Sequence, residues 1–262
     1  MESTTLTAAD GVVLDAAVHL ASSVPSRGVA LLVHGITVDK DEGGKMFVRL
    51  ADRLGSAGFD VVRFSFRGHG ASTGLSQGMT IAGECLDLQA AVKYTRDRFA
   101  GPLSVVAASF GAVPTALQLP WLAQGLGRLV LWNPVLDLRR TFLEPELAWG
   151  KENFGPEQQR RLDETGVLTV DGEFELGRVL FSEFEHYRPL DCFLESAVPA
   201  LIVHGDRDTA VSYDIAVEAA RVRPGTELRT IAGSDHGFDS REREDEAIAV
   251  TVDWLEQSAR AS

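Results

Sequence analysis

The sequence of 262 residues is short of cysteine and has no long apolar run. Its two cysteines, Cys85 and Cys192, lie far apart in apolar surroundings, which predicts reduced thiols in a cytoplasmic protein, with a disulfide as the alternative. No apolar stretch approaches the roughly 20 residues that a bilayer requires, so no membrane span is expected. The N-terminal segment carries Glu2 and lacks both a basic and a long apolar region, so it is not typical of a signal peptide.

Positive charge is also scarce, because 25 lysines and arginines stand against 38 aspartates and glutamates, a formal net charge of −13. Nucleic acid is not an expected partner, since phosphate contacts need basic patches, and an anionic membrane is equally disfavoured. The sequence contains no HExxH motif, no cysteine pair and no carboxylate-rich calcium loop, so no metal site is expected. The expected partner is a small molecule, and the sequence leaves a homodimer open.

Apolar, strand-like runs alternate with helical patterns along most of the chain. Several of these runs are almost wholly apolar, as parallel strands covered on both faces are. The alternation predicts an α/β fold with a mostly parallel, doubly wound sheet, in which ligands collect at the carboxyl ends of the strands. The predicted strands are Val12–Leu20, Val29–Gly35, Asp60–Phe66, Leu103–Ser109, Arg128–Asn133, Ala200–Gly205 and Thr226–Ile231, and the predicted helices are Lys45–Ala57, Ile81–Phe99, Tyr213–Val222 and Glu242–Ser258.

The alternation breaks between Pro134 and Pro199, where aromatic residues gather but no buried strand is evident. We therefore predict a core domain formed by residues 1–134 and 198–262, with an inserted cap at residues 135–197. Within this cap, VLTVDGEFEL has two β-prone runs around Asp171-Gly172, which predicts a hairpin with a type I′ turn. We expect the hairpin and the aromatic residues to cover a pocket at the carboxyl ends of the strands and to select a bulky or aromatic ligand group; the alternative is that they form only the cap's own core.

The segment LSVVAASFGAV places one hydroxyl at the end of an apolar strand. Ser109 stands between two small residues, Ala107 and Gly111, and the segment continues into the helical FGAVPTALQL. A nucleophile on a sharp strand-to-helix turn has strained backbone dihedrals, and bulky side chains two residues away on either side would collide across the turn. The usual pattern is Gly-x-Ser-x-Gly, from which Ala107 departs by one methyl group. The pattern predicts a nucleophilic Ser109, and a helix N-cap serine is the alternative.

A serine hydroxyl needs a base that takes its proton and an acid that orients the base. His236 in AGSDHGF directly follows the last predicted strand and is the candidate base, with a loop histidine that caps the final helix as the alternative. Asp206 and Asp208 both follow the strand ALIVHG. We favour Asp208 as the acid, because it is clear of the strand and can reach a neighbouring loop. Asp206 is placed to hydrogen-bond local backbone instead.

An oxyanion is usually bound by two backbone N–H groups, one from the residue after the nucleophile and one from the loop after an earlier strand. Position alone assigns these roles to Phe110 and to Ile36 in VHGIT, where His34-Gly35 also forms a tight turn. The glycines of FSFRGHGASTG match part of a dinucleotide-binding fingerprint, with Asp87 downstream. The loop LSQGMT follows, however, in place of the helix that would bind a pyrophosphate, so no cofactor is expected.

Five segments together resemble the α/β-hydrolase superfamily: VHGIT, FRGHGAS, AASFG, HGDRDTAV and SDHGF occur in its order and approximate spacing over nearly the whole chain. FSFRGHGAS, MTIAGECLDL and an insertion after the sixth strand are most similar to bacterial cinnamoyl and feruloyl esterases. The resemblance implies Ser109, Asp208 and His236 as a catalytic triad, with Ile36 and Phe110 forming the oxyanion hole. Residues of the cap that would contact a substrate cannot be carried over, because the cap does not match closely.

The expected function is therefore a serine hydrolase that cleaves a carboxylic ester through an acyl-enzyme, without a cofactor. Thioester, lactone or amide hydrolysis and acyl transfer use the same three residues and stay open as alternatives. A ligand-binding protein without catalysis is a remoter one, because the fold also serves receptors.

Overall fold

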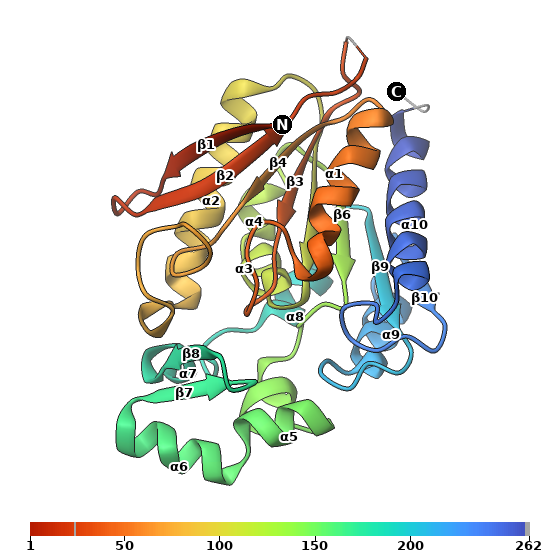
Figure 1. The fold of residues 1–262 in the computed structure, drawn as a ribbon. Coiled ribbons are helices and arrows are strands. Elements are labelled where there is room, and N and C mark those ends of the chain that lie inside the picture. Colours follow the sequence, from red (N-terminus) through yellow and green to blue (C-terminus); the bar gives the residue numbers. More distant parts are fainter. Residues whose placement is uncertain (24, 260–262) are drawn as a thin grey trace.

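The structure is a computed structural model that describes residues 1–23 and 25–259. Within these residues eight strands form one sheet in the order β1-β2-β4-β3-β5-β6-β9-β10 (Figure 1). β1 and β2 run antiparallel to their neighbours, and the pairs from β4 to β10 are parallel. The strands are β1 Glu2–Thr7, β2 Val13–His19, β3 Val29–Val33, β4 Asp60–Phe64, β5 Leu103–Ala108, β6 Leu126–Trp132, β9 Ala200–Gly205 and β10 Thr226–Ile231. The prediction of a mostly parallel, doubly wound sheet is confirmed.

Helices cover both faces of this sheet, which explains why its central strands are apolar throughout. In β5, Val105 and Ala107 belong to the cluster under one helical layer, whereas Val106 and Ala108 belong to the cluster under the other. Two-residue alternation thus places apolar side chains on both faces. The first layer contains α2 Ile81–Arg98, α3 Ala112–Leu117, α4 Leu119–Leu122, α8 Pro189–Glu195 and α9 Tyr213–Val222, and the second contains α1 Met46–Ser56 and α10 Arg241–Ala259 (Figure 1).

The sequence pattern predicted every strand of this sheet except β1. The segment ESTTLT is polar, and Leu6 is its one buried residue. It lies at the edge of the sheet, where the backbone ladder with β2 holds it without an apolar face. When β1 is counted, the segment predicted to be a cap follows the sixth strand, as the resemblance implies.

The segment between β6 and β9 lies at the carboxyl ends of the parallel strands (Figure 1). It contains α5 Ala148–Phe154, α6 Pro156–Thr165, the strands β7 Val167–Val170 and β8 Phe174–Gly177, and α7 Arg178–Glu183. The predicted hairpin is confirmed, because β7 and β8 pair antiparallel. Asp171 and Gly172 have φ of 50° and 75°, and the Glu173 N–H donates to the Val170 carbonyl oxygen at 3.1 Å. Both positive φ angles fit the predicted turn.

The helix α8 also belongs to the predicted cap, but it packs against α3 and α9. Its Phe193 is fully buried in the core cluster on the sheet, and the Phe193 carbonyl oxygen accepts a hydrogen bond from Arg223. Both cysteines are free thiols, as predicted, Cys85 buried and Cys192 half-buried. Among the residues that the structure describes, no helix is both long and apolar enough to cross a membrane.

Candidate active site

Ser109 lies directly after β5, at the start of a single 3-10 turn, Ser109–Gly111, that leads into α3. Its φ is 49°, which L-amino acids rarely adopt. A Cβ on Gly111 would come within 2.4 Å of the His34 carbonyl oxygen and 2.7 Å of that of Val33. The turn is thus strained at the serine and admits no side chain at position 111, as the sequence pattern predicted.

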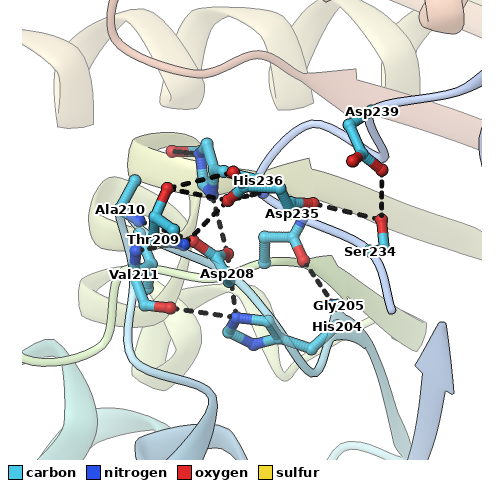
Figure 2. Close-up of polar contacts among 12 residues, drawn as sticks. His204, Gly205, Asp208, Thr209, Ala210, Val211, Ser234, Asp235, His236 and Asp239 are labelled. Carbon is cyan, nitrogen blue, oxygen red and sulfur yellow. Dashed lines mark hydrogen bonds and ion pairs between the residues drawn. The ribbon is translucent and has the colours of Figure 1, made fainter. Parts of the chain in front are cut away.

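Three side chains from separate loops form a hydrogen-bond chain that begins at Ser109. His236, in the loop after β10, has its Nε2 3.1 Å from Ser109 Oγ. Its Nδ1 lies 2.8 Å from Oδ2 of Asp208, which follows β9 (Figure 2). Since an ionised carboxylate only accepts, Nδ1 donates to Asp208 and the Nε2 lone pair faces the serine hydroxyl. The structure therefore brings together Ser109, His236 and Asp208, three residues that the sequence predicted to act together.

The Asp208 carboxylate is buried, and both of its oxygens have hydrogen-bond partners. Oδ1 accepts the N–H groups of Ala210 and Val211 at 2.9 and 2.8 Å, and Oδ2 also lies 3.0 Å from Nε2 of the buried His204 (Figure 2). Asp206 does not join this network, because its Oδ1 accepts the Gly233 N–H at 2.6 Å. The two aspartates thus lie as their distances from the strand predicted: Asp208 reaches the histidine and Asp206 binds backbone.

Burial and charge act in opposite directions on this pair. Burial alone would lower the pKa of His236, but the Asp208 carboxylate, and after it Glu42 and Asp235, outweigh that effect and raise the pKa. Burial alone would raise the pKa of Asp208, but His236 and then His204 hold it below its usual range. The site therefore favours a charged Asp208 and stabilises a protonated His236.

The loop after β3 contains Ile36, the predicted second N–H donor. The His34 ring accepts the Phe66 N–H at Nε2, so its Nδ1 carries the proton and donates to the Gly35 carbonyl oxygen at 2.6 Å. In a trans peptide the N–H points opposite to the C=O, so the Ile36 N–H points away from His34. Among the described residues, neither Ile36 N–H nor Phe110 N–H donates to an acceptor. Both groups are free to bind a ligand atom.

A cavity of about 280 Å³ opens beside Ser109 and His236. Its wall combines the loop after β3 with residues of the segment between β6 and β9, among them Phe142, Trp149 and Asp171. The Trp149 indole N–H donates to Asp171 at 2.9 Å, which ties α5 to the hairpin tip. The other lining residues are Gly35, Ile36, Thr37, Val38, Glu42, Gly43, Val135, Thr141, Thr209, Ala210, Val211, Asp235 and Gly237.

The family model for the α/β-hydrolase family matches residues 30–250, most of the chain and all of the site. The chain belongs to the α/β-hydrolase family. A search of curated proteins found no match.

Several solved structures share the fold of this α/β-hydrolase. Est1E from Butyrivibrio proteoclasticus with ferulic acid bound is 24% identical, with a TM-score of 0.82 over 98% of this chain and 100% of that one. A putative hydrolase from Agrobacterium vitis S4 is 20% identical, with a TM-score of 0.79 over 95% and 97%. The Pyrococcus furiosus esterase Pf2001 is 21% identical, with a TM-score of 0.72 over 98% and 90%. At such identities the likeness shows the fold alone.

Sequence reasoning missed several residues of this α/β-hydrolase site. Asp235 accepts the His236 N–H at 2.7 Å and the Thr209 N–H at 2.8 Å, so it connects the loops after β9 and β10. Its position next to His236 was the available signal. Glu42 and His204 carried no motif, because their contacts with Gly35 and Asp208, though close in sequence, depend on loop conformations that the sequence does not specify. Among the residues that the structure describes, no cluster of three or more potential ligands could hold a metal ion.

Proposed function

We propose that this α/β-hydrolase is a serine hydrolase that cleaves a carboxylic ester through an acyl-enzyme. The hydrogen-bond chain from Ser109 through His236 to Asp208, open to a cavity, is the observation that supports the proposal. A solvated serine hydroxyl is a weak nucleophile, and this arrangement supplies the base and the orienting acid that activate it.

In the first half of the reaction, Ser109 Oγ attacks the ester carbonyl carbon while His236 Nε2 takes the hydroxyl proton. The negative oxygen of the tetrahedral intermediate is bound by the N–H groups of Ile36 and Phe110. The intermediate collapses when His236 gives its proton to the departing alcohol, which leaves the acyl group on Ser109. Asp208 keeps the proton on Nδ1 and stabilises the imidazolium ion.

In the second half, a water molecule replaces the alcohol and gives a proton to His236 Nε2 as it attacks the acyl carbonyl carbon. The same two N–H groups bind the second oxyanion. His236 then returns the proton to Ser109 Oγ, and the carboxylic acid leaves. No cofactor or metal takes part in either half.

The segment between β6 and β9 acts as a cap that selects a bulky or aromatic substrate group. Phe142 and Trp149 line the cavity and supply flat apolar surface. Phe154, Phe181 and Phe184 contact other aromatic rings of the cap instead. Phe142 and Trp149 also contact the ring of Phe154, so the pocket wall lies directly on the core of the cap. A deletion that tests the cap should stop before α8, because Phe193 packs in the main core.

An ester fits the cavity better than a coenzyme-bound thioester. Among the described residues that line it, Glu42, Asp171 and Asp235 carry carboxylates, and none is a lysine or arginine. A polyphosphate leaving group would find no cationic partner there. The preferred substrate is a neutral ester. The cytoplasmic location, the small-molecule partner and a homodimer stay predictions.

The proposal is tested by labelling with a fluorophosphonate and by turnover on matched esters, thioesters and amides. Ser109→Ala should abolish labelling and lower kcat by about 10⁶, because the acyl-enzyme forms on this oxygen. Ser104→Ala, on the same strand but outside the cavity lining, is the matched control and should be labelled as wild type is. Labelling of Ser109→Ala at the wild-type rate would contradict the assignment.

A further inference from the structure

We propose that Glu42 is a positioning residue of this site: its carboxylate holds the Gly35 N–H and thereby the direction of the neighbouring Ile36 N–H for oxyanion binding, and its negative charge stabilises the protonated His236. The inference rests on the proposed function and adds a residue that neither the sequence motifs nor the comparisons assign. Its evidence lies in the loop between β3 and α1.

Glu42 is held in a costly backbone conformation. Its φ of 58° and ψ of 166° lie in a region that is essentially restricted to glycine. A non-glycine residue there is strained, so surrounding contacts must hold it in place. The contacts of the side chain are suited to that role: Oε2 accepts the Gly35 N–H at 2.9 Å and Oε1 accepts the Gly43 N–H at 3.2 Å. The strain places the carboxylate between these two backbone donors.

These contacts matter because they hold the peptide that carries the Ile36 N–H and the peptides on either side of it. His34 holds the Gly35 carbonyl oxygen, Glu42 holds the Gly35 N–H, and His69 Nε2 contacts the Ile36 carbonyl oxygen. Of the backbone N–H and C=O groups of Gly35 and Ile36, the Ile36 N–H is the one without a hydrogen-bond partner among the described residues. Loss of the Glu42 carboxylate would free the Gly35 end of the loop to turn, and the Ile36 N–H would lose its fixed direction.

The Glu42 carboxylate also acts on His236 through its charge. Both residues line the cavity, and Glu42 contributes to raising the pKa of His236. The other acidic groups that face His236 are Asp208 and Asp235, while Asp39 of the same loop faces Glu42. Among the described residues, Glu42 has no lysine or arginine in an ion pair. Burial raises the pKa of Glu42, against the Gly35 and Gly43 N–H groups and His236, so the carboxylate carries its charge above that raised pKa. It can therefore stabilise the imidazolium ion that forms during each half-reaction.

Two substitutions separate position from charge. In Glu42→Gln the amide oxygen can still accept the Gly35 N–H, so kcat should stay within about tenfold of wild type, since a neutral bond is roughly half as strong as a charge-assisted one. Without the charge the pKa of His236 falls, and the acidic limb of kcat/KM should move to lower pH. Glu42→Ala loses both effects, and its kcat should fall by about 10²-fold, the lower end of the loss for a missing oxyanion donor. KM should change little in either.

The control is Asp39→Asn, which removes a carboxylate from the same loop without touching Gly35. It should keep the wild-type kcat and the wild-type acidic limb. Thermal unfolding should accompany each assay, and if Glu42→Ala does not fold, the pH profile of Glu42→Gln decides. The inference would be overturned if the acidic limb of the kcat/KM pH profile did not move in Glu42→Gln, or if the Gln and Ala variants lost equal amounts of kcat. In either case, Ser109-dependent turnover by the wild type would still support the proposed function. A wild type that neither turns over esters nor labels at Ser109 overturns both.

Discussion

Replacing Asp208 by asparagine should slow ester hydrolysis by about 10⁴-fold without unfolding the protein. Oδ1 of Asp208 accepts the Ala210 and Val211 N–H groups, and the amide oxygen of asparagine can keep both bonds. The amide nitrogen then replaces Oδ2 and points its hydrogens at His236 Nδ1. His236 must carry its proton on Nε2, where no lone pair is left for the Ser109 hydroxyl. A loss of 10⁴ corresponds to about 5 kcal/mol of activation free energy.

The fold should tolerate Asp208→Asn because His204, the second histidine that contacts Oδ2, can change its tautomer. Its buried Nδ1 has no hydrogen-bond partner within residues 1–23 and 25–259, so the proton can move there and let Nε2 accept from the asparagine. The assay is kcat and KM on one activated ester, with thermal unfolding of each variant. Asp206→Asn is the matched control: it alters one bond to Gly233 and should lower stability by about 1 kcal/mol with near-normal kcat. A slow Asp206→Asn beside a near-normal Asp208→Asn would refute the reasoning.

Three further predictions concern the turn, a buried acid and the cavity wall. Gly111→Ala should lower the free energy of unfolding by about 1–3 kcal/mol, measured with denaturant, because the new Cβ meets backbone oxygen; unchanged stability would contradict the steric argument. Burial raises the pKa of Glu84 well above its usual range, so the contribution of this group to the free energy of unfolding should fall as pH rises above the unfolded pKa of about 4.5. Glu84→Gln should therefore unfold at a higher temperature than wild type at pH 8 but not at pH 4. Trp149→Ala should lower kcat/KM for a bulky aromatic ester by about tenfold relative to an acetate ester, since it removes about 1–3 kcal/mol of apolar contact. Phe181→Leu, inside the cap core, should leave that ratio unchanged, and equal effects of the two would refute a direct role for Trp149.

The sequence predicted those parts of the fold whose local signal agrees with their final environment. The apolar sequence of β5 predicts a buried strand, and both faces of β5 are in fact covered. Asp171-Gly172 predicts a hairpin turn because these residues accept the positive φ that the turn requires. β1 was missed because a polar edge strand is held by backbone pairing, which leaves no periodic pattern.

The same distinction applies to the candidate site. Ser109, His236 and Asp208 could be predicted because each follows a strand end in a segment with a characteristic composition. Glu42 could not, because its local sequence gives no reason for a glutamate to adopt a glycine-like conformation. Its contact with Gly35 exists only once the loop after β3 has folded back on itself. Side chains that serve the geometry of other residues are therefore the part of a site that sequence patterns reveal least.

The packing of α8 on the main core has a consequence for how such an enzyme can change its substrate. β6 and β9 are parallel neighbours, and α8 by itself is enough to connect them as an ordinary crossover helix on one face of the sheet. The elements α5 to α7 are therefore inserted into a connection that α8 is enough to complete. This inserted segment can be lengthened, shortened or exchanged while Ser109, Asp208 and His236, which follow β5, β9 and β10, stay in place.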